Sequence, residues 1–155
     1  KGLIEITDTE IRNGLKQTKW KGRLELLKRN PKFLIDGAHN LQGAKTLAES
    51  LKMLKYRRLI LGIGILKDKD VEHMVEVLAP LADEIIITEV DMPRKMAAQS
   101  LEEIIKRYNN NTFIEKDIKK AIDKTYELAN KEDLIVFAGS LYLIGDVRRI
   151  LLTNN

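Results

Sequence analysis

The sequence has no cysteine, which excludes a disulfide framework and any thiolate metal site. Aromatic residues are few, with one tryptophan, four tyrosines and three phenylalanines, and they are not interleaved with a basic stripe. Nucleic-acid binding is therefore not expected. The longest apolar runs, such as Leu134–Ala138, are far too short to cross a bilayer, and the chain does not open on a basic and apolar leader. We expect a cytoplasmic protein with no nucleic-acid and no membrane partner.

What the chain does have fits one soluble domain. It holds 155 residues, of which 44% are hydrophobic and 32% charged. The net charge of +4 arises from 27 basic and 23 acidic residues that alternate along the chain. Such mixing is typical of solvated helix faces. Position 1 is Lys, and the first dozen residues resemble the end of something earlier, so we expect a fragment of a longer chain.

Short apolar segments alternate with segments of helical period along most of the chain. The pattern predicts strands at 23–28, 33–35, 59–65, 85–87, 113–114 and 134–138, and helices at about 7–18, 41–54, 71–81, 100–108, 118–129 and 141–152. The turn dipeptide Asn30-Pro31 predicts that the first two strands form an antiparallel edge pair. The fold class expected is α/β: a Rossmann-like, doubly wound, mostly parallel sheet of about six strands with helices on both faces.

In such a sheet, ligands bind outside the carboxyl ends of the strands. The first strand-to-helix turn there is Asp36–Asn40, which carries a carboxylate, an imidazole and an amide. The free N–H groups of the following helix suit a phosphate or a carboxylate. In the alternative interpretation Asn40 caps the helix, Asp36 accepts from nearby amides, and His39 is an ordinary loop residue. The residues alone favour this second interpretation.

Two glycine motifs in the same region do not make a nucleotide site. The segment GAHNLQGAKT at 37–46 has its glycines one residue too far apart for a phosphate loop, and Lys45 does not follow a glycine. Gly62-Ile63-Gly64 lacks the third glycine of a dinucleotide fingerprint. The chain therefore has no phosphate loop of its own.

The remaining turns offer further polar residues, each with two interpretations. Asp68 or Asp70 is expected to cap the following helix, and Arg94 either holds an anion or is simply exposed. Ser140 either caps the last helix or binds a carboxylate, and without a GxSxG frame it is not a nucleophile. Arg23 is either exposed or a phosphate clamp.

Six short motifs occur in order along the chain: WKGR at 20–23, LE at 24–25, IDGAHN at 35–40, KDKD at 67–70, PR at 93–94 and GSLYL at 139–143. Together they resemble the C-terminal domain of folylpolyglutamate synthase and dihydrofolate synthase, in the Mur ligase superfamily. They cover nearly the whole chain. Two positions depart from the family, because Lys21 and Leu41 stand where prolines are usual.

The resemblance implies an ATP-dependent ligase that adds L-glutamate to a folate or dihydropteroate through an acyl phosphate. It implies that Arg23 and Asp36 contact ATP, and that His39 and Ser140 line the glutamate site. Residues 1–19 would be a lead-in helix and linker from an N-terminal ATPase domain, and 20–155 the ligase C-terminal domain. The phosphate loop and the Mg²⁺ ligands would lie on that N-terminal domain, so this part alone would be inactive.

A hypothesis from another class is a freestanding α/β ligand-binding or receiver-like signalling module. A receiver needs an acceptor Asp after its third strand and a Lys near its last one. Here the third parallel turn is Asp91-Met92-Pro93, and the last strand ends at Ala138-Gly139-Ser140 without a Lys. This pattern is a poor match to a receiver.

Overall fold

The computed structural model describes residues 7–17 and 20–153. The first element is helix α1, Asp8–Gln17. Its start is a capping box, since Thr7 Oγ1 accepts from Glu10 N at 3.3 Å and Glu10 Oε2 accepts from Thr7 N at 2.9 Å. The helix predicted for the beginning of the chain is therefore present, while its expected last residue, Thr18, lies outside the described residues.

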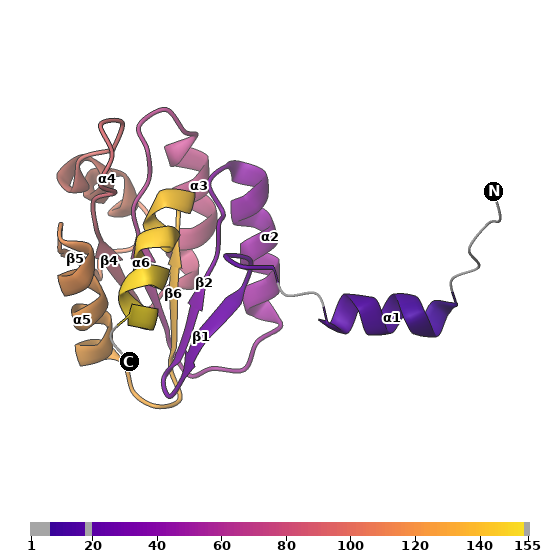
Figure 1. The fold of residues 1–155 in the computed structure, drawn as a ribbon. Helices are drawn as coiled ribbons and strands as arrows, with labels where there is room; N and C mark the ends of the chain where they lie inside the picture. Colours follow the sequence, from indigo (N-terminus) through magenta and orange to yellow (C-terminus); the bar gives the residue numbers. More distant parts are fainter. Residues whose placement is uncertain (1–6, 18–19, 154–155) are drawn as a thin grey trace.

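A single six-stranded sheet forms the centre of the molecule, in the order β1-β2-β6-β3-β4-β5 (Figure 1). Strand β1 pairs with β2 in antiparallel fashion, and all other neighbours are parallel. The strands are β1 Glu25–Arg29, β2 Lys32–Ile35, β3 Leu59–Ile63, β4 Glu84–Ile87, β5 Thr112–Ile114 and β6 Leu134–Ala138. The predicted fold class and the antiparallel edge pair are both confirmed.

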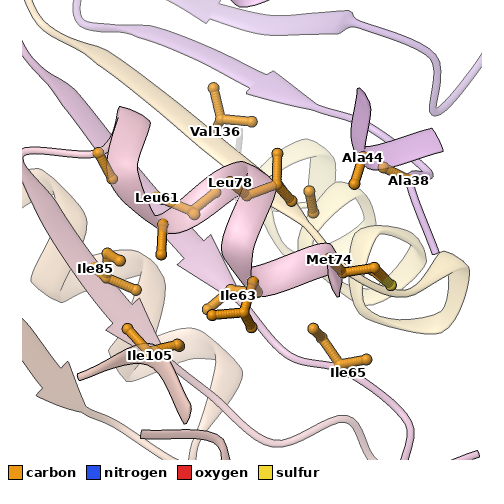
Figure 2. Packing of buried hydrophobic residues seen from close by; sticks show 14 of the residues in the cluster. Ala38, Ala44, Leu61, Ile63, Ile65, Met74, Leu78, Ile85, Ile105 and Val136 are labelled. Carbon is orange, nitrogen blue, oxygen red and sulfur yellow. The ribbon is translucent and has the colours of Figure 1, made fainter. Parts of the chain in front are cut away.

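Helices cover the two faces of the sheet and bury two separate apolar clusters. They are α2 Leu41–Lys52, α3 Val71–Leu78, α4 Ala98–Ile105, α5 Ile118–Leu128 and α6 Leu141–Thr153. The first cluster joins the sheet to α2, α3 and α4, and Figure 2 shows part of it around Leu61, Met74 and Val136. The second joins the opposite face to α5 and α6.

The central strand β6 contributes buried side chains to both faces of the sheet. Alternate residues point to opposite sides of a strand, so Val136 lies in the first cluster and Phe137 in the second. The Phe137 ring stacks on that of Phe33 with centroids 5.4 Å apart. On neighbouring β3 the residue facing this ring is Gly62, where a Cβ atom would come within 2.4 Å of Phe137. A glycine inside a buried strand is thus explained by the aromatic ring beside it.

Several element boundaries differ from those predicted, most clearly at α3 and α4. The helix expected at 71–81 ends as an α-helix at Leu78 and continues as a 3₁₀ turn, Ala79–Leu81, because Pro80 has no N–H for an α-helical bond. The helix expected at 100–108 instead spans Ala98–Ile105. Beyond it, the Asn109 amide donates to the carbonyls of Ala79 and Ala82, which fixes these residues in a turn.

The connections between strands create a crevice at one end of the sheet. From β2 the chain passes through α2 to β3, which leaves a gap between the two strands. From β5 it returns through α5, and β6 fills that gap. The helices that follow β2 and β6 therefore lie on opposite faces of adjacent strands. This is the topological switch point where open α/β sheets bind ligands.

Candidate functional site

Two strand-to-helix turns are joined directly at the switch point. Asp36 N donates to the Phe137 carbonyl at 3.0 Å, and Gly139 N donates to the Ala38 carbonyl at 2.9 Å. The turn after β2 and the turn after β6 thus form one surface. The predicted residues Asp36, His39 and Ser140 all belong to these two turns.

Arg23 reaches the same surface from the loop that precedes β1. Gly37 N donates to the Gly22 carbonyl at 2.7 Å, which holds the loop against the turn. A Cβ atom on Gly37 would lie 3.0 Å from Arg23 Nη1 and 2.6 Å from Leu141 Cδ2. Glycine at position 37 therefore leaves room for the guanidinium, and the four predicted site residues lie at one end of the sheet.

The Asp36 carboxylate is buried and accepts two backbone hydrogen bonds. Its Oδ2 accepts from Leu24 N and its Oδ1 from Ala38 N, each at 2.9 Å. Leu24 has a φ of 41°, in the left-handed region that costs a non-glycine residue about 1–2 kcal/mol. Asp36 thus stabilises the unusual loop backbone next to Arg23, as predicted by the interpretation in which it accepts from nearby amides. The left-handed conformation of Leu24 also explains why β1 begins at Glu25, two residues later than expected.

A pocket opens beside Asp36, and we name it the Asp36 pocket. It has a volume of about 410 Å³ and is lined by Arg23, Leu24, Asp36, Asn40, Gln42, Gly43, Thr46, Leu47 and Ser50. Asn40 caps α2 by accepting from Gly43 N at 2.8 Å, as expected. Leu41 begins this helix, so α2 forms without the proline usual at that position in the family. The volume of the pocket and the polar side chains among its lining residues suit part of a large ligand.

A second, smaller pocket lies on the other side of the same turn, and we name it the Ser140 pocket. It has a volume of about 200 Å³ and is lined by His39, Leu66, Lys69, Arg94, Gly139, Ser140, Leu141 and Tyr142. Ser140 is only 2% exposed, and its Oγ accepts from Tyr142 N at 3.2 Å, which caps α6. The hydroxyl hydrogen is not used in that bond and can be donated to a ligand.

The tautomer of His39 follows from its contact with the backbone of its own turn. Its Nδ1 lies 2.7 Å from the Gly37 carbonyl oxygen. Because a carbonyl can only accept, Nδ1 carries the hydrogen, and Nε2 of the neutral ring is left as an acceptor. The imidazole is thereby fixed by the backbone of its own turn.

Gly139 allows the turn after β6 to pass close to β3. Its φ is 110°, and a Cβ atom there would lie 2.8 Å from the Gly64 carbonyl oxygen. A side chain at this position would be both strained and blocked. Glycine at position 139 therefore lets the backbone before Ser140 pass close to the segment that follows β3.

The interpretation of Asp68 or Asp70 as a helix cap is wrong. Asp70 stands at the N-cap position of α3 but makes no capping hydrogen bond. Its Oδ1 lies 2.7 Å from His73 Nδ1, and this contact raises the pKa of His73. Asp68 instead accepts from Arg94 Nη1 at 2.6 Å. The sequence located both carboxylates correctly, but Asp68 pairs with Arg94 and Asp70 contacts His73 instead of capping α3.

The described residues limit what else the site can hold. Within 7–17 and 20–153, no group of three His, Asp or Glu side chains is placed to bind a metal ion. Within the same residues, no helix is long and apolar enough to cross a membrane.

Comparison with known proteins agrees with this geometry. The family described as Mur ligase, glutamate ligase domain, matches residues 22–141. The chain belongs to this family, which rules out the receiver-like alternative as its class.

Within the family, the chain is similar to the C-terminal part of folylpolyglutamate and dihydrofolate synthases. It is 32% identical to the dihydrofolate synthase/folylpolyglutamate synthase of Bacillus subtilis, over 96% of this chain and 34% of that protein. It is 31% identical to the folylpolyglutamate synthase of Lacticaseibacillus casei, over 95% of this chain and 33% of that protein. The chain thus spans about a third of the length of these relatives, and the resemblance noted from its motifs is confirmed.

Solved structures of related enzymes have the same fold over nearly the whole of this chain. Escherichia coli FolC in complex with DHPP and ADP matches with a TM-score of 0.88 at 25% identity, covering 97% of this chain and 36% of that one. Mycobacterium tuberculosis folylpolyglutamate synthase complexed with ADP also matches with a TM-score of 0.88, at 26% identity, covering 95% of this chain and 36% of that one.

Proposed function

We propose that this domain is the closing half of an ATP-dependent ligase that adds L-glutamate to a folate or dihydropteroate. The observation that carries the proposal is the Asp36–Asn40 turn, which has a pocket of about 410 Å³ on one side and one of about 200 Å³ on the other. A nucleotide on the first side and an amino acid on the second would meet at this turn. The names of the relatives, and the ADP present in two similar structures, support the assignment.

Arg23 and Asp36 are proposed to serve the nucleotide. Arg23 lines the Asp36 pocket, where a fixed cation can stabilise charge that develops on a transferring phosphoryl group. Each Asp36 oxygen accepts one backbone N–H and keeps a further lone pair, so it can still accept from a ribose hydroxyl. Asp36 would then bind the nucleotide and hold the Arg23 loop at the same time.

His39 and Ser140 are proposed to serve the incoming glutamate. Ser140 can donate its hydroxyl hydrogen to a carboxylate at the start of α6, where the helix dipole also favours negative charge. The free Nε2 of His39 can accept from the amino group of the glutamate. These contacts would orient the amine toward the turn that separates the two pockets.

The proposed reaction has two steps. The terminal carboxylate of the folate attacks the γ-phosphorus of ATP, which forms an acyl phosphate and releases ADP. The glutamate amine then attacks the acyl carbon, the C–N bond forms, the amine loses a proton, and inorganic phosphate leaves. The described residues hold no group of three acidic or histidine side chains placed to bind Mg²⁺, and we propose that its ligands lie on a preceding domain.

The assignment of domains follows from this scheme. Residues 1–19 would connect an N-terminal ATPase domain, and residues 20–155 would close over its phosphate loop. Closure would join the two halves of the site and exclude water from the acyl phosphate. The 155-residue chain alone should then neither hydrolyse ATP nor form an amide bond.

A direct test compares the 155-residue chain with the full-length protein that carries it. Phosphate release is measured with ATP, L-glutamate and a reduced folate or dihydropteroate, and the product is weighed by mass spectrometry. The full-length protein should release phosphate only with all three substrates and add one glutamate residue per turnover. Turnover by the short chain would contradict the half-site, and absence of glutamate from the product would contradict the ligase.

A further inference from the structure

The segments at the amino ends of three neighbouring strands, β2, β6 and β3, are tied to one another. They lie at the end of the sheet opposite the Asp36–Asn40 turn, the lower end in Figure 1. Arg57 N, just before β3, donates to the Glu132 carbonyl, just before β6, at 3.0 Å. Lys32 is the first residue of β2, and its Nζ donates to the Lys55 carbonyl at 2.8 Å. Side chains that project from these segments therefore start from fixed positions.

A pocket of about 470 Å³ is formed by these segments, and we name it the amino-end pocket. Its lining residues are Lys32, Lys55, Tyr56, Arg57, Lys131 and Glu132. Four of them carry a positive charge and one a negative charge. None of the residues proposed to serve the ligase reaction lines this pocket. A hollow that is lined mostly by one sign of charge focuses its field and attracts the opposite charge.

The positive charges of the amino-end pocket are not balanced by nearby carboxylates. Among the described residues, Lys55, Arg57 and Lys131 form no ion pair. The buried Asp133 carboxylate at the same end of the sheet is engaged by Arg58, whose Nη2 lies 2.8 Å from Asp133 Oδ2. Arg57 has only a weaker charge interaction with it. The cations that line the pocket therefore repel one another, and a bound anion would relieve that repulsion.

The side chains that line the pocket also indicate the class of anion. Lysine and arginine are donors without acceptors, and the planar fork of arginine matches two oxygens of a phosphate group. A single carboxylate would neutralise one cation, whereas linked phosphates place several negative charges within a short length. We infer that the amino-end pocket binds a short polyphosphate chain, either free or carried by a nucleotide. The inference does not depend on the proposed ligase function, because the pocket lies at the other end of the sheet.

The test is isothermal titration calorimetry of the 155-residue chain with tripolyphosphate at constant ionic strength. The double variant Arg57→Gln with Lys131→Gln should raise the Kd about tenfold to a hundredfold, since two contacts between charged groups are lost. Added KCl should also raise the Kd of the unaltered chain. Tripolyphosphate at a hundred times its Kd should raise the Tm of the chain by about 5–10 °C.

The matched control is the double variant Arg107→Gln with Lys45→Gln. Both residues are exposed, neither lines the amino-end pocket, and the net charge changes by the same amount. This variant should keep the normal Kd. If the chain does not bind tripolyphosphate, or if both double variants bind it equally well, the inference is wrong.

Two further ligands distinguish the sources of the anion. ATP that binds more tightly than tripolyphosphate, with the same loss in the double variant Arg57→Gln with Lys131→Gln, would assign the pocket to a nucleotide. ATP that binds more weakly would assign it to free polyphosphate. Citrate offers three carboxylates and no phosphate, and equal affinity for citrate would overturn the assignment to phosphates.

Discussion

Replacing Asp36 with alanine removes the acceptor of two backbone hydrogen bonds at once, those from Leu24 N and Ala38 N. A hydrogen bond to a charged group contributes about 1.5–3 kcal/mol. The bond to Leu24 is only partly buried, so water can replace some of it. We expect a loss of unfolding free energy of about 3 kcal/mol for Asp36→Ala. In a domain of this size that loss lowers Tm by about 6–12 °C.

Asp36→Asn separates the two bonds, because an amide keeps one acceptor oxygen and presents N–H groups to the other donor. Its loss should be about half that of Asp36→Ala. Glu49→Ala is the control, since Glu49 is 71% exposed and pairs with Lys52 on the same helix; its Tm should change by less than about 2 °C. Thermal and urea unfolding of the three variants measures these differences. A Tm for Asp36→Ala close to that of Glu49→Ala would refute the claim that this carboxylate stabilises the loop before β1.

Further predictions concern one glycine, one buried acid and one arginine of the site. Gly139→Ala should destabilise the domain by about 3 kcal/mol, because residue 139 has a positive φ and the new Cβ would lie 2.8 Å from the Gly64 carbonyl oxygen. Gly145→Ala is the control: a Cβ there meets nothing within 4 Å, so thermal unfolding should show a slightly higher Tm. Burial alone raises the pKa of Asp133, but hydrogen bonds from Arg58 and from Asn130 N outweigh it and leave this pKa below the usual 3.8. Asp133 thus contributes stability above pH 3.8, and this contribution is lost as the pH falls through the lower pKa of the folded state. In Asp133→Asn, the unfolding free energy should therefore fall less steeply with decreasing pH, as measured by acid unfolding followed by circular dichroism. In the full-length ligase, Arg23→Gln should lower kcat more than it raises the KM for ATP; equal kcat in the variant and the parent enzyme would argue against contact with the transferring phosphoryl group.

Hydrophobic periodicity predicted the architecture well, because each strand and helix has its own repeat of apolar residues. Strand β6 was located correctly at both ends, since its five residues are all buried and are bounded by a turn on each side. Boundaries were less certain where tertiary contacts decide them. The end of α4 depends on the Asn109 side chain, which binds carbonyls in a distant 3₁₀ turn, and no local pattern shows this.

The candidate site also has residues that the sequence could locate and others whose placement depends on tertiary contacts. Asp36, His39 and Ser140 follow predicted strands, so the rule for parallel sheets brings them to one end without any knowledge of contacts. Lys69 and Arg94 also follow strands, but their shared pocket depends on the bridge between Leu66 and Lys95, which pairs residues from two different loops. The PR and KDKD motifs marked these loops, while the pairing of Asp68 with Arg94 depends on how the two loops fold against each other.

The position of β6 in the sheet has a consequence for synthesis on the ribosome. This strand is hydrogen-bonded to β2 on one side and β3 on the other, yet it is the last strand to be translated. Until Leu134–Ala138 leaves the exit tunnel, the β1–β2 hairpin and the β3–β4–β5 ladder have no common neighbour. Before β6 is available, the edges of β2 and β3 that pair with it remain open, so the nascent domain cannot complete its sheet until this strand has emerged.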